Sequence, residues 1–125
     1  MQTDNTAAAQ AAQAFLKVLA KAEVNLTNPA ALEFWTLQRN TLKENATNIT
    51  TSAAVEAQRE AFGLISESLI VSLDAFGQEG GTLYVQHCPM AFDNEGGDWL
   101  AKEEAIQNPY FGDKMMRCGV VKKTY

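Results

Sequence analysis

Apolar side chains recur every three or four residues through the first 77 positions, which is the spacing of one face of an α-helix. Residues 6–26 form the first such stretch and are rich in Ala, a strong helix former. Its stripe consists of Phe15, Leu19, Ala22 and Leu26. The pattern therefore predicts a first amphipathic helix.

Two further helices are predicted by the same spacing. Asn28-Pro29 supplies a capping side chain followed by Pro at the first helical position, and the apolar stripe, interrupted by Arg39, could run into the polar stretch 45–52. A third helix is predicted over residues 55–76, with polar Gln58 in its stripe and Gly77 as a left-handed cap. None of the three can bury its stripe alone, so we expect an antiparallel bundle.

The helical spacing ends after Gly77, and glycines and prolines punctuate the rest of the chain. We predict a mainly α single domain over 1–125: a bundle of three long helices (1–77) and a loop-rich C-terminal tail (78–125) packed on it. Short β-prone runs at 82–86 and 119–121 could pair as a small β-ribbon. Asp98 is expected to cap a short helix through Ile106.

Composition removes several classes of function. The 125 residues carry 10 Lys and Arg against 15 Asp and Glu, and the net charge of -5 lacks the basic footprint of a nucleic-acid binder. No apolar run approaches the roughly 18 residues of a membrane span, so no membrane insertion is expected. The chain also lacks a nucleophile elbow, a phosphate-cradling loop, a dinucleotide fingerprint and a Cys-x-x-Cys motif, which argues against an enzyme.

Soft metal donors are concentrated in the tail. The single His, both Cys and three of the four Met lie between His87 and Cys118. Thiolate and thioether groups select Cu(I), or Ag(I) by the same softness, and suit magnesium or calcium poorly. The sequence therefore predicts a Cu(I) site with candidate ligands His87, Cys88, Met90, Met115 and Cys118.

Spacing restricts which of these donors can act together. In an extended segment His87 and Cys88 point to opposite faces, which argues against a catalytic Cys-His pair, whereas Cys88 and Met90 share a face. Met115 and Cys118 are three apart and share one side of a helical turn. We expect these two edges to face each other, with His87 joining only if the following turn swings it round.

A disulfide between Cys88 and Cys118 is the alternative interpretation. Closing this 30-residue separation would stabilise the fold by about 3 to 4 kcal/mol in the chain-entropy model. Met90 and Met115 would then be packing residues. In that case the chain would be a structural or protein-interaction domain without a metal site.

The tail resembles the signature of the bacterial domain-of-unknown-function family 3347. The resemblance rests on His87-Cys88-Pro89-Met90-Ala91, Trp99-Leu100, Asn108-Pro109-Tyr110-Phe111-Gly112, Met115 and Cys118-Gly119, about the last 40 residues. Agreement in the third predicted helix is looser and involves Arg59, Phe62 and Ser66. Similar domains occur alone in exported proteins and at the C-terminal end of CusB-type periplasmic adaptors of copper/silver RND efflux systems.

The resemblance implies a compartment and a role. It implies a periplasmic or otherwise exported protein that buffers copper or delivers it to an efflux system. The expected partner is an RND periplasmic adaptor or a copper chaperone. The chain does not start with a signal peptide, so we expect any export signal to have been removed.

Overall fold

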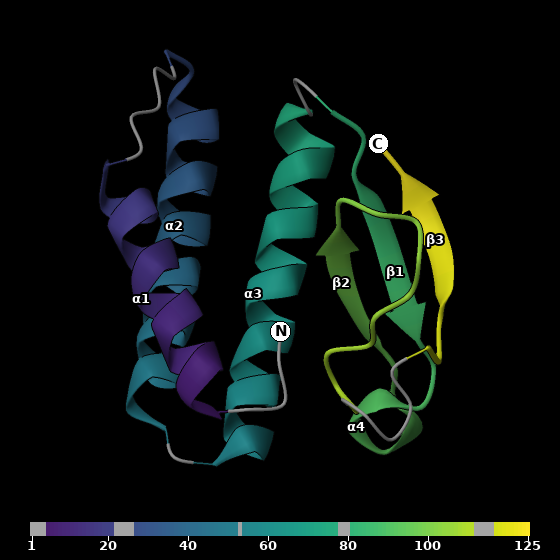
Figure 1. Ribbon diagram of the computed structural model, residues 1–125. Helices are drawn as coiled ribbons and strands as arrows, with labels where there is room; N and C mark the ends of the chain where they lie inside the picture. The colour runs from purple at the N-terminus through teal and green to yellow at the C-terminus, as the bar shows by residue number, and fades with distance from the viewer. Residues whose placement is uncertain (1–4, 22–26, 53, 78–80, 112–116) are drawn as a thin grey trace.

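The computed structural model describes residues 5–21, 27–52, 54–77, 81–111 and 117–125 (Figure 1). Its three long helices are α1 (Asn5–Lys21), α2 (Pro29–Thr51) and α3 (Val55–Phe76). The tail forms strands β1 (Tyr84–Cys88), β2 (Gly97–Ala101) and β3 (Val120–Thr124) and the one-turn helix α4 (Ala91–Asn94). The sheet lies on the side of α3 away from α1 and α2, with β2 against α3. In the described part of the chain, no helix combines the length and hydrophobicity needed to cross a bilayer.

The helix boundaries confirm the three predicted helices, the first as far as Lys21; its predicted end, with Ala22 and Leu26, lies outside the described residues. The Asn28 side chain accepts hydrogen bonds from two main-chain N–H groups of the first turn of α2, at 2.9 and 3.3 Å. That helix continues through the polar stretch to Thr51. Gly77 ends α3 with a φ of +81°, although its ψ of 178° is extended and differs from the left-handed helical value of the predicted cap.

The two polar interruptions of the apolar stripes serve the ends of neighbouring helices. Arg39 Nη2 donates to the main-chain oxygen of Leu19 at 3.2 Å, and Leu19 lies in the last turn of α1. Gln58 is 1% exposed, and its Nε2 donates to the main-chain oxygen of Ile49 at 3.1 Å near the end of α2. The last carbonyls of a helix have no partner within it, so both side chains replace water there.

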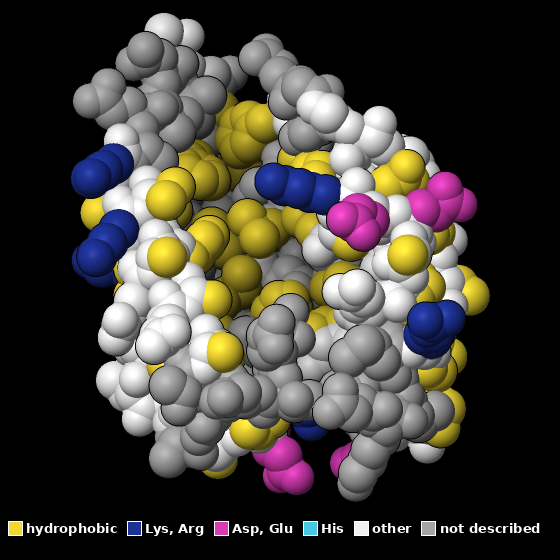
Figure 2. Space-filling model, in the orientation of Figure 1, with side chains coloured by type: hydrophobic (Ala, Val, Ile, Leu, Met, Phe, Trp, Pro, Cys, Tyr) yellow, Lys and Arg dark blue, Asp and Glu magenta, His cyan; other side chains and the backbone are white. Residues whose placement is uncertain are grey.

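Two buried clusters share one residue. The helical core consists of Ala8, Ala12, Leu19, Leu42, Ala46, Ile49, Ala61 and Ile65. A smaller core in the tail consists of Cys88, Ala91, Trp99 and Tyr110, and Phe62 of α3 packs against both. Phe62 therefore couples the tail to the bundle. Figure 2 shows hydrophobic side chains in a hollow at the centre of this face, between α1 and α2 on one side and the tail on the other.

The sheet extends the predicted ribbon by one strand. Strand order is β2-β1-β3, and both pairs are antiparallel. The pairing of β1 with β3 confirms the ribbon expected from residues 82–86 and 119–121.

The short helix expected from Asp98 to Ile106 is wrong, because Asp98 lies within β2 opposite His87. Pairing with β1 and burial of Trp99, which is 3% exposed, outweigh the local capping signal. Gly97 also fits only without a side chain, since a Cβ there would lie 2.8 Å from the Tyr110 ring.

A polar clamp joins the end of the chain to α3. Lys123 Nζ lies 2.7 Å from Asp74 Oδ1, and the Tyr125 hydroxyl donates to the same oxygen. The hydrogen bonds from Lys123 and Tyr125 lower the pKa of Asp74 below its ordinary value of 3.8. The clamp therefore favours the ionised carboxylate.

Asp74→Asn is expected to lower the melting temperature slightly at pH 7. A carboxyl whose pKa is depressed in the folded state stabilises the protein above its unfolded-state pKa and loses that contribution as pH falls through the folded value. The melting temperatures of wild type and variant should therefore converge in acid, which thermal unfolding at pH 7 and near pH 2 measures. A constant difference at both pH values would contradict the assignment.

Candidate functional site

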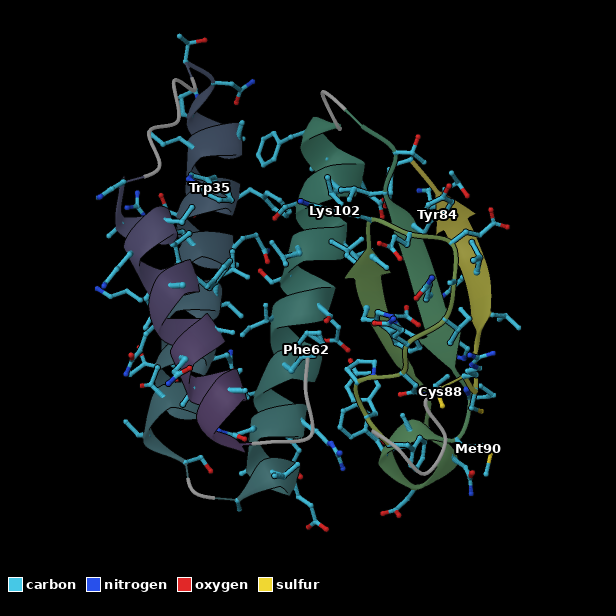
Figure 3. The ribbon with its side chains drawn as sticks, in the orientation of Figure 1. Trp35, Phe62, Tyr84, Cys88, Met90 and Lys102 are labelled. Atoms are coloured by element: carbon cyan, nitrogen blue, oxygen red, sulfur yellow. The ribbon has the colours of Figure 1, made fainter. Side chains whose placement is uncertain are left out.

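Cys88 and Cys118 are brought together at one end of the sheet. Cys88 is the last residue of β1 and is 0% exposed, beside the α4 turn (Figure 3). Cys118 comes two residues before β3 and packs against the cluster that contains Cys88. Both are free thiols, and Cys88 lies close enough to Cys118 to affect its pKa. The expected meeting of these two donors is therefore present.

Asn108 fixes the position of Cys118. Its side chain is 2% exposed; Nδ2 donates to the main-chain oxygen of Cys118 at 2.8 Å, and Oδ1 accepts from the Tyr110 N–H at 2.8 Å. A buried amide bonded at both ends holds one rotamer. The Asn-Pro-Tyr-Phe segment thus holds the main chain at Cys118 in place.

Gln86 supports the same face of β1 as Cys88. It is 0% exposed; Oε1 accepts from Trp99 Nε1 at 2.8 Å, and Nε2 donates to the main-chain oxygens of Glu103 and Glu104, both at 3.0 Å. These bonds hold the segment after β2 against the sheet. Trp99 is therefore a fixed wall of the tail core.

The thiol of Cys118 is held in its protonated form. Burial raises its pKa, and the hydrogen bond and charge interaction with Cys88 raise it further. A thiol reacts as its thiolate, so a raised pKa slows modification. Cys118 therefore needs either a higher pH or a metal ion to lose its proton.

In the folded protein we expect iodoacetamide to modify Cys118 slowly and Cys88 only after unfolding. Cys118 is partly exposed, whereas Cys88 has no accessible surface. Peptide mapping by mass spectrometry over time, with and without urea, measures both rates. Labelling of Cys88 in the native state at the rate of Cys118 would contradict the placement of the pair.

Met90 does not share the face of Cys88, so that expectation is wrong. Met90 is 46% exposed, while Cys88 is fully buried. The strand ends at Cys88, and Met90 already has helical dihedrals, φ -94° and ψ -9°, at the start of the α4 turn. Alternation of faces therefore stops at Cys88, before it could bring Met90 to the thiols.

His87 points to the other face of β1 from Cys88, as the alternation of strand residues predicts. Its Nδ1 donates to Asp98 Oδ1 at 2.6 Å, and Lys122 Nζ lies 3.2 Å from Asp98 Oδ2. The turn after the strand does not swing His87 toward the thiols. The structure thus orients His87 through a carboxylate, away from the cysteine pair.

Met115, the remaining candidate ligand, lies outside the described residues. Within the described ranges, His, Cys, Asp and Glu side chains nowhere form a group of three that could hold a metal ion. The two thiols alone suit a soft ion of low coordination number and do not suit the four-ligand sites of structural zinc. On donor chemistry the pair therefore fits Cu(I) or Ag(I).

Sequence reasoning missed three supporting residues. Gln86 lies two positions before Cys88. Side chains two apart in a strand point to the same face, so this spacing could have predicted that Gln86 faces the same core. Asp98 was assigned to a helix cap and instead orients His87. The Tyr110 hydroxyl donates to the Asp98 main-chain oxygen at 2.6 Å, a contact between distant segments that local sequence does not encode.

Comparison with known proteins identifies the family from the helical part of the chain. The model of the family described as protein of unknown function (DUF3347) matches residues 1–81, which include α1, α2 and α3 and end before β1. The match therefore rests on the segment whose resemblance was looser, and the motifs from His87 to Gly119 lie beyond it. No curated protein and no solved structure matches the chain. The chain belongs to the DUF3347 family.

Proposed function

We propose that this protein is a non-enzymatic binding module for Cu(I) or Ag(I), with Cys88 and Cys118 as its central ligands. One observation carries the proposal: two thiols separated by 30 positions in the sequence lie together at one end of the sheet, and Asn108 holds the main chain of one of them. Soft thiolates select Cu(I) among the physiological metals. Binding by both thiolates would release the protons of both thiols.

The proposed ligand set is narrower than the five candidates from the sequence. Met115 remains our choice for a third ligand, because a thioether three positions before Cys118 supplies a further soft donor. His87 is engaged by Asp98, and Met90 is exposed. We therefore propose a sulfur-only site.

The proposed role is copper buffering or delivery outside the cytoplasm. Partial exposure of Cys118 supports transfer, since an incoming thiol or thioether could reach the metal through it while Cys88 stays buried. An efflux adaptor or a copper chaperone is the proposed partner. Resemblance of the tail motifs to copper/silver efflux adaptors supports this choice.

An anaerobic titration tests the proposal. Fully reduced protein competes with a chromogenic Cu(I) chelator, and we expect about one ion per chain to be removed from the chelator. The chelator absorbance measures stoichiometry and affinity together. Absence of any competition would overturn the metal-binding function.

A disulfide that pins the tail is the second candidate, favoured by the same proximity of the two thiols. It would make the chain a structural or interaction domain, with Trp99 and Tyr110 as packing residues. Intact mass after alkylation of the protein unfolded without reductant separates the two states. Two free thiols accept two labels, whereas a disulfide accepts none.

A further inference from the structure

A cavity separate from the thiol pair lies beside the tail core, between the first turns of α3 and the α4 turn. Its volume is about 770 Å³, and its walls include Arg59, Met90, Phe92, Tyr110 and Phe111. The thiol pair does not line it. Aromatic and thioether side chains therefore surround one basic group, a combination typical of sites for small organic ligands.

Arg59 brings to this cavity one donor atom without a hydrogen-bond partner. Its Nε atom is buried without a hydrogen bond, and no ion pair of Arg59 occurs among the described residues. A buried donor without a hydrogen bond costs free energy, which a bound acceptor would recover. The planar donor fork of arginine matches a carboxylate in a bidentate arrangement.

The opposite wall is made from strained backbone. Phe92, Asp93 and Asn94 have φ values of 53°, 55° and 69°, a left-handed run that side chains other than glycine rarely adopt. The run places the Phe92 ring over Gly63 of α3, where a Cβ would lie only 3.0 Å from that ring. It also sets Phe92 edge-on to Tyr110 at 5.0 Å between ring centroids. This wall is therefore formed by residues held in an unfavourable backbone conformation.

Acidic groups line the cavity from its exposed side. Glu56, Glu60 and Asp93 all belong to the lining and are exposed, whereas Arg59 is partly buried. A ligand that enters from solvent would therefore contact these carboxylates before it reaches the Arg59 guanidinium. A molecule with an ammonium group, a carboxylate and an apolar body complements the exterior carboxylates, the Arg59 guanidinium and the aromatic walls, respectively.

We propose that this cavity binds a small α-amino acid with an apolar side chain. The carboxylate pairs with Arg59, the ammonium lies among the exterior carboxylates, and the side chain packs against the aromatic walls. This inference is independent of the metal site, because neither cysteine takes part.

Heteronuclear NMR titration of the full chain with three compounds tests the proposal. L-Phenylalanine is expected to shift the resonances of Arg59, Phe92 and Tyr110, 3-phenylpropionate to bind more weakly, and phenethylamine, which lacks the carboxylate, to bind at least about tenfold more weakly. Equal binding of phenethylamine and phenylalanine would overturn the role of Arg59. No shift with any of the three would overturn the site.

Arg59→Gln and Lys43→Gln form a matched pair of variants. Both remove one positive charge, but Lys43 is exposed on α2 and does not line the cavity. Arg59→Gln should weaken phenylalanine binding about tenfold or more, with an unchanged or higher melting temperature, because it removes a buried donor that has no hydrogen bond. Lys43→Gln should change neither. Unchanged binding in Arg59→Gln would contradict the proposal.

Discussion

Replacing Cys118 by serine is expected to lower Cu(I) affinity by more than about a hundredfold, since even the outer-shell partners of metal ligands contribute ten- to a hundredfold. The substitution keeps the size and the Asn108 contact, which uses the main-chain oxygen of residue 118. Cys88→Ser should have a similar effect. Competition with a chromogenic chelator measures both, and circular dichroism checks that helical content is retained.

Met90→Leu and His87→Gln are the matched controls for this series. Each removes a candidate donor that the structure places away from the thiols: Met90 is exposed, and His87 is bonded to Asp98. Both variants should bind Cu(I) as the wild type does. If either lost affinity to the extent of Cys118→Ser, the sulfur-only site would be wrong.

Tyr110→Ala is expected to destabilise the protein by about 3 to 5 kcal/mol, the usual cost of truncating a buried aromatic residue. Tyr110 is 5% exposed, and its ring contacts those of Phe62, Phe92 and Trp99 at centroid distances of 5.9, 5.0 and 5.8 Å. It therefore joins α3, the α4 turn and β2. A loss of this size is a large part of the stability of an ordinary domain. Urea denaturation measures it.

Tyr110→Phe separates packing from the hydroxyl. The hydroxyl donates to the Asp98 main-chain oxygen at 2.6 Å, and burial raises the pKa of Tyr110. Its removal should destabilise the protein by only about 1 kcal/mol. In Tyr110→Ala, but not in Tyr110→Phe, alkylation of Cys88 should become fast in the native state. Equal losses of stability in the two variants would show that ring packing is not what joins the tail to α3.

The helical bundle was predictable because its signals are local. The three-four spacing and the cap at Asn28 place α2 and α3 at the positions the structure shows. The polar residues Arg39 and Gln58 interrupted the stripes in the sequence. Their partners are main-chain oxygens of neighbouring helices, which only the packed bundle brings near.

The tail was harder to predict because its structure depends on pairing between distant segments. The run Asp98-Trp99-Leu100-Ala101 does not alternate cleanly between polar and apolar residues, so it lacks the signal of a half-buried strand. It becomes β2 because β1 pairs with it and Trp99 finds Gln86 as a buried partner. Such tertiary context overrides local propensity.

The candidate site was predictable in part. The donor types and their spacing correctly predicted that Cys88 and Cys118 lie close together. Strand alternation correctly predicted that His87 lies on the other face. Met90 was misplaced because the strand ends at Cys88, two residues before Met90, and the alternation assumed that it continued. Arg59 gave no signal of its own, since one arginine on an amphipathic helix resembles a solvated residue.

X-ray absorption at the copper edge of Cu(I)-loaded protein tests the central claim most directly. The proposed site predicts scattering from sulfur alone, with the same spectrum in His87→Gln and no bound copper in the Cys88→Ser Cys118→Ser double variant. Nitrogen scatterers lost in His87→Gln, or copper retained by the double variant, would contradict the account.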